Sequence, residues 1–161
     1  MTGRWLALPL AMSMLPASAS ARDSLGIYSD WAAFRDAEIP RCYAIARPER
    51  RRSGPWQAFA SVGTWPERAR RGQVHFRLRR EMREDSTPIL TIGARRFELV
   101  GRGPDAWAES SRDDAAIVAA MRNGATMRIE ARSRGGRFAD SYDLSGAASA
   151  IDAAALGCAE N

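Results

Sequence analysis

The chain has 161 residues, and its 24 basic side chains are all arginine, because the sequence contains no lysine. Because the chain also has 19 acidic residues, its net charge is only +5. The electrostatic field of such a mixed surface is weak, and it identifies no anionic partner. After residue 21 no apolar run is long enough to form a membrane-spanning helix, so the mature chain is predicted to lack a transmembrane segment.

The first 21 residues have the three parts of a secretory signal peptide. Arg4 supplies a positive charge, residues 5–15 form an apolar run too short to span a bilayer, and residues 19–21 (ASA) match the cleavage pattern. We therefore expect cleavage after Ala21 and a periplasmic or secreted protein. Export also argues against a nucleic-acid partner.

The first half of the mature chain is predicted to form strands. Residues 73–79 alternate with period two, which places Val74, Phe76 and Leu78 on one face and His75, Arg77 and Arg79 on the other. Residues 27–34 are interpreted as one bent strand. Further strands are expected at 42–46, 58–62, 89–92 and 97–100, with residues 93–96 as the turn between the last two.

The second half adds two helices and a hairpin. Ser111 is predicted to cap a helix that runs to about Asn123, and a second helix is expected over residues 148–156. Residues 127–132 and 137–144 alternate as strands on either side of a Gly-Gly pair, which favours a hairpin. The whole pattern predicts one mainly β domain over residues 22–161, an antiparallel β-sandwich-like fold with two short helices.

Cys42 and Cys158 are the two cysteines of the chain. An even number of cysteines in a small exported domain favours a disulfide. Cys158 continues the i, i+3, i+4, i+7 spacing that Ile151 begins, so it should face the core. Two buried free thiols, or pairing between two chains, remain the alternatives.

His75 is the only histidine, so any Ser-His-Asp or Cys-His catalyst would have to use it. Its position within a regular strand favours a solvent-facing histidine, because catalytic groups more often lie on loops or at strand ends. Three Cys and His residues are too few for a structural zinc site. We therefore predict no catalytic residues, no cofactor and no metal, with an envelope hydrolase based on His75 as the alternative.

Four outward arginines could instead bind an anionic surface such as lipid phosphate: Arg77, Arg79, Arg128 and Arg132. A continuous arginine face with few acids beside it would favour this hypothesis. If Glu98 and Glu130 lie among the arginines, the charges are cross-strand pairs instead.

The order of the motifs IPRCYAIARP, QVHFRLRR, LTIGARRFELVGRG, DDAAIVAAMRNG and DSYDLSGAASAIDAAALGC resembles a known group. It is similar to small exported alphaproteobacterial proteins related to the invasion-associated locus B family, over roughly residues 25–158. The resemblance implies an all-β sandwich with small helices in the cell envelope, and it supplies no catalytic residues. This chain has fewer cysteines than other members, which indicates a divergent two-cysteine branch.

Together these observations predict an exported, non-enzymatic domain that binds an envelope protein or supports the envelope. The sequence leaves the oligomeric state of the protein open.

Overall fold

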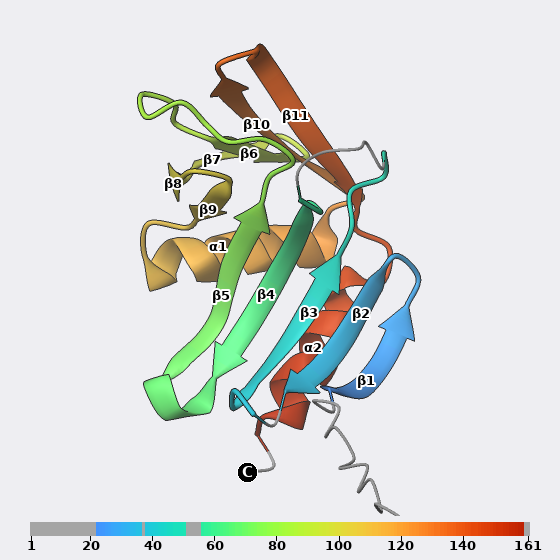
Figure 1. The fold of residues 1–161 in the computed structure, drawn as a ribbon. Coiled ribbons are helices and arrows are strands. Elements are labelled where there is room, and N and C mark those ends of the chain that lie inside the picture. The colour runs from blue at the N-terminus through green and yellow to red at the C-terminus, as the bar shows by residue number, and fades with distance from the viewer. Residues whose placement is uncertain (1–21, 37, 51–55, 160–161) are drawn as a thin grey trace, which may run out of the picture.

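The computed structural model describes residues 22–36, 38–50 and 56–159, and in this part of the chain two antiparallel sheets and two α-helices make up the fold (Figure 1). The predicted signal peptide and its cleavage site lie outside the described residues. The larger sheet has seven strands in the order β1-β2-β3-β4-β5-β9-β8. Their bounds are Arg22–Tyr28, Trp31–Asp36, Arg41–Ala46, Phe59–Trp65, Arg70–Arg77, Asp105–Trp107 and Val100–Arg102, and a short 3-10 helix, Pro66–Arg68, joins β4 to β5.

The smaller sheet has four strands in the order β11-β10-β6-β7, with bounds Gly136–Asp143, Thr126–Ser133, Ile89–Ile92 and Arg95–Glu98. Helix α1 (Ser111–Asn123) packs against β5, and helix α2 (Ala147–Gly157) packs against β1, β2 and β3. Neither helix is long and apolar enough to cross a membrane, and they are the only α-helices among the described residues. The prediction of a mainly β, sandwich-like fold with two helices is confirmed.

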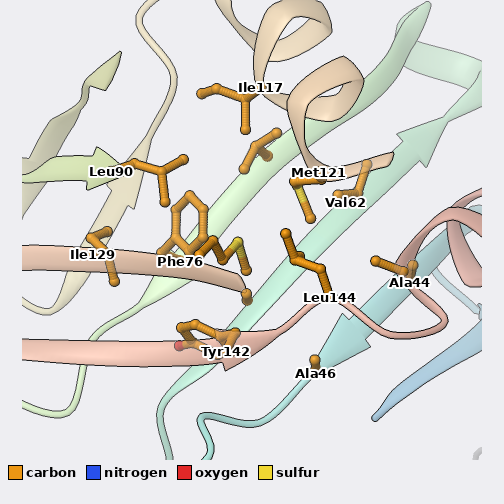
Figure 2. Packing of buried hydrophobic residues seen from close by; sticks show 14 of the residues in the cluster. Ala44, Ala46, Val62, Phe76, Leu90, Ile117, Met121, Ile129, Tyr142 and Leu144 are labelled. Carbon is orange, nitrogen blue, oxygen red and sulfur yellow. The ribbon is translucent and has the colours of Figure 1, made fainter. Parts of the chain in front are cut away.

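The core lies between the inner face of the seven-stranded sheet, the four-stranded sheet and the two helices. Val74, Phe76 and Leu78 are fully buried there, as the alternation of residues 73–79 predicts. Figure 2 shows Phe76 of β5 gathered with Leu90 and Ile129 of the smaller sheet. Because successive side chains of a strand point to opposite faces, the residues between these core positions must lie on the outer face.

A disulfide joins Cys42 of β3 to Cys158 at the end of α2, with the two Cα atoms 5.7 Å apart. This confirms the predicted crosslink and excludes free thiols and pairing between chains. Both cysteines are buried. The bond holds α2 on the inner face of β1–β3, and neither of the two described α-helices covers the outer face (Figure 1).

Helix α1 is anchored by a polar contact. The Asp114 carboxylate accepts a hydrogen bond of 2.8 Å from the main-chain N–H of Val74 in β5. Burial raises the pKa of Asp114, and this hydrogen bond opposes the shift. The cap of the same helix is Ser110, whose hydroxyl oxygen accepts a hydrogen bond from the main-chain N–H of Asp113 at 3.2 Å and whose hydroxyl donates to the Asp113 carboxylate at 2.6 Å.

Several predicted boundaries are wrong. Residues 27–34 belong to two strands, β1 and β2, joined by a turn at Ser29 and Asp30, with Ser29 in the left-handed region (φ 52°). The predicted cap Ser111 is the first helical residue, and Ser110 is the cap. Residues 93–96 are only partly a turn, because β7 already begins at Arg95, and the predicted strand 97–100 is divided between β7 and β8.

Candidate functional site on the outer face

The outer face of the seven-stranded sheet carries a row of half-buried aromatic and aliphatic side chains. Cross-strand pairing produces this row, since Phe34 lies opposite Tyr43, Ile45 opposite Ser61, Ser61 opposite His75, and His75 opposite Trp107. We define the outer face by these residues and Phe59: Phe34, Tyr43, Ile45, Phe59, Ser61, His75 and Trp107. All seven are intermediate in exposure, which means that they are neither core nor freely solvated.

His75 lies at the centre of a polar and aromatic cluster. Its Nε2 lies 2.9 Å from Oδ1 of Asp105, and both side chains are about one quarter exposed. The imidazole stacks on Trp107 with ring centroids 5.1 Å apart and planes 7° apart, and the ring of Phe59 meets it edge-on at 5.2 Å. The predicted solvent-facing histidine is therefore held on three sides by its neighbours.

Ser61 lies beside this pair on β4, so a serine, a histidine and an acid share one surface. The Ser61 hydroxyl donates to the main-chain carbonyl oxygen of His75 at 3.4 Å. In a serine hydrolase the imidazole lies between the hydroxyl and the carboxylate and accepts the hydroxyl proton. Here that proton points to the main chain, so the arrangement lacks the contact that would activate Ser61.

A groove of about 770 Å³ runs over the part of the outer face formed by β1–β4. Its floor is apolar and aromatic, with Phe34, Tyr43, Ile45 and Phe59 among the lining residues. Charged residues of both signs also line it: Arg22, Arg47, Asp30, Glu49 and Asp143. An apolar floor with a few polar groups at the edge is the usual composition of a binding site.

Two arginines of the larger sheet lie over aromatic rings. The Arg41 guanidinium is 4.9 Å from the centre of the Tyr43 ring, and that of Arg77 is 5.7 Å from the ring of Trp56. Such contacts hold long side chains in place, so less conformational entropy is lost when a partner binds them. Trp56 is fixed in turn, since its indole N–H donates to the Leu78 carbonyl at 2.6 Å.

The four arginines proposed from the sequence as an anion site do not share one surface. Arg77 is on the outer face of the larger sheet, whereas Arg128 and Arg132 are on β10 of the smaller sheet. Arg79 follows the end of β5 and lies 3.5 Å from the buried Asp140. Arg79 and Arg128 nevertheless line one polar cavity of about 460 Å³, together with Arg137 and with the acidic residues Glu49, Glu130 and Asp140. The structure thus brings two of the four side chains together, among acidic residues, and leaves Arg77 on the other sheet.

Acidic residues lie among the arginines of the smaller sheet. Glu130 and Glu98 both pair with Ile89, so they share one cross-strand row, while Arg128 and Arg96 share the next row through Thr91. Arg128 also contacts Glu130 at 3.1 Å. Glu98 and Glu130 therefore lie among the arginines, so these strands do not form a continuous arginine face. The ion pair between Arg128 and Glu130 joins two residues of β10, however, and is not the expected cross-strand pair.

Asp140 and Tyr142 are buried polar groups on the inner face of β11. Burial raises the pKa of Asp140, opposed by a hydrogen bond of 3.1 Å from the main-chain N–H of Arg79. Burial also raises the pKa of Tyr142, whose hydroxyl has no hydrogen-bond partner. Among residues 22–36, 38–50 and 56–159 there is no cluster of three His, Cys, Asp or Glu side chains that could hold a metal ion.

Sequence reasoning missed Asp105 and Trp107 as members of the candidate site. The signal was present in Asp105-Ala106-Trp107, where Ala106 is fully buried and its two neighbours point to the outer face. Three residues are too short a run for a strand prediction. Comparison with protein-family models, with curated proteins and with solved structures finds no match for this chain.

Proposed function

We propose that this chain is an exported, non-enzymatic domain of the cell envelope that holds a protein partner on its outer face. The signal-peptide pattern of residues 1–21 and the resemblance to the invasion-associated locus B family support the compartment. The Cys42–Cys158 disulfide is consistent with it, since such bonds persist in oxidising compartments. The function follows from the outer face, which neither α1 nor α2 covers.

The observation that carries this proposal is the composition of that surface. Protein interfaces are enriched in Trp, Tyr, Phe and Arg, and their central hot spots are aromatic or arginine side chains fixed by their neighbours. The outer face has this composition, with Tyr43 under Arg41 and with Trp107 against His75. The mixed charges around the groove supply the polar rim of such an interface.

The test is a pull-down from the envelope fraction with matched variants. Ile45→Asp places a charge in the middle of the groove, and Thr91→Asp makes the same change at a half-exposed position inside the smaller sheet. We expect Ile45→Asp to lose the partner while Thr91→Asp retains it, because a charge at the centre of an interface is desolvated without a counter-ion. Equal retention by both variants would contradict the proposal.

A hydrolase is the second candidate, favoured by the contact between His75 and Asp105. It predicts measurable turnover of ester or peptide substrates that is lost in His75→Ala and in Ser61→Ala. The binding proposal predicts that neither variant changes any turnover of the purified protein. As a control, the circular dichroism spectra and melting temperatures of both variants are compared with those of the wild type to check that the fold is intact.

A further inference from the structure

A second concave site lies on the side of the larger sheet opposite to the outer face. It is a cavity of about 390 Å³ between α1, α2 and β4, which we call the helix groove. Its lining is mostly small and aliphatic and includes Val62, Val118, Ala119, Ile151, Ala154 and Ala155. Two of the three lining residues that α2 supplies, Ala154 and Ala155, are alanines. The two helices therefore leave space between them that larger side chains would fill.

The charges of the helix groove have a single sign. Arg71 and Arg122 are the charged residues that line it, and no acidic side chain does so. Arg71 has no acidic side chain within 4 Å among the described residues. Arg122 contacts Asp152 of α2 at 2.6 Å through one terminal nitrogen, so it bridges the two helices and keeps further N–H donors.

An apolar channel with a positive edge is complementary to a molecule that has an aliphatic chain and an anionic end. The volume lies near the lower limit of the range of about 300–1,000 Å³ for ligand pockets, which suits one chain and not the two chains of a phospholipid. We propose that the helix groove binds a single-chain alkyl carboxylate. The chain lies against Val118 and Ala154, and the guanidinium of Arg71 holds the carboxylate. This inference is independent of the protein partner on the outer face.

The experiment is isothermal titration of the purified mature protein with octanoate, decanoate and dodecanoate below their micelle concentrations. Burial of each added methylene should strengthen binding about fourfold, so each step of two carbons gives about 15-fold. Arg71→Gln should weaken dodecanoate binding and leave dodecanol binding unchanged. Affinity that does not depend on chain length, or wild-type protein that binds dodecanol as tightly as dodecanoate, would overturn the proposal.

Filling the groove gives an independent test. Ala119→Leu places an aliphatic side chain in the groove from an exposed helix position, where leucine is tolerated well. Ser149→Leu is the matched control, on an exposed position of α2 that does not line the groove. We expect the first variant to lose at least 10-fold in dodecanoate affinity and the control to bind as the wild type does. If Ala119→Leu fails to fold, Ala155→Leu fills the groove from α2 instead. Unchanged dodecanoate affinity in whichever of these variants folds would refute the site.

Discussion

Removal of the Cys42–Cys158 bond should destabilise the domain by several kilocalories per mole. The two cysteines are 116 positions apart, so the bond closes nearly the whole described chain into a loop. In the chain-entropy account a loop of this length contributes about 5 kcal/mol, because the crosslinked unfolded chain has fewer conformations to lose. For a domain of this size that difference corresponds to a melting temperature lower by about 15 °C.

The assay is urea unfolding of the double variant Cys42→Ala, Cys158→Ala, followed by tryptophan fluorescence. Trp31 is fully buried and its indole N–H donates to the Asp143 carbonyl at 2.9 Å, so its emission should report loss of the core. Wild-type protein treated with a phosphine reductant should unfold at the same urea concentration as the variant. A loss below about 1 kcal/mol in both would refute the loop-closure reasoning.

Three further results are expected. Gly146→Ala should lower the unfolding free energy by more than about 3 kcal/mol, because Gly146 has φ +83° and an added Cβ would collide with the main chain at the end of β1. Gly93→Ala, at φ +57° in open space, should lower it by only about 1 kcal/mol in the same urea assay. Similar losses in the two variants would contradict this reasoning. Burial raises the pKa of Asp140 above its ordinary 3.8, so the folded state holds that proton more tightly than the unfolded chain does. The unfolding free energy of the wild type relative to Asp140→Asn should therefore fall as the pH rises above 3.8, and a rise would refute the assignment. His75→Ala should lower the unfolding free energy by about 1 kcal/mol through lost stacking on its neighbours, measured by thermal melting, and a loss of the whole fold would show that the cluster is structural.

The parts of the fold that were predictable follow from local periodicity. Val74, Phe76 and Leu78 are buried because they alternate with polar residues, and this alternation alone separates the inner from the outer face of β5. Cys158 is buried because it continues the helical spacing set by Ile151. In both cases the residues that determine the burial pattern lie within a single strand or helix.

The turn between β1 and β2 was not predictable in the same way. Hairpin turns are recognised by glycine or asparagine at positive φ, but here Ser29 adopts φ 52° without either residue. The helix cap was not predictable from spacing either. Ser110 and Ser111 each have an aspartate three residues after them, and only the tertiary contacts separate them, because Asp114 accepts from the Val74 main-chain N–H while Asp113 pairs with Ser110.

The candidate site depends on pairing between distant strands, which periodicity does not contain. Asp105 is 30 positions from His75, and it reaches the imidazole only because β9 pairs with β5 in the larger sheet, after the intervening strands β6 and β7 have paired in the smaller one. The aromatic row has the same origin, because Tyr43 of β3 and Trp107 of β9 lie 64 positions apart in the sequence. The sequence alone predicts which face of a strand is exposed to solvent, but it does not predict which strands lie side by side and so bring their exposed side chains together.

The most direct test of the account is site-specific photo-crosslinking in the envelope. A photoreactive side chain at Phe59 lies on the outer face, and the same group at Thr91 lies on the smaller sheet. The account predicts one discrete crosslinked protein from position 59, none from position 91, and loss of the product when Ile45→Asp is added. Equal crosslinking from both positions, or a product from position 59 that persists with Ile45→Asp, would contradict the claim that the outer face holds a partner.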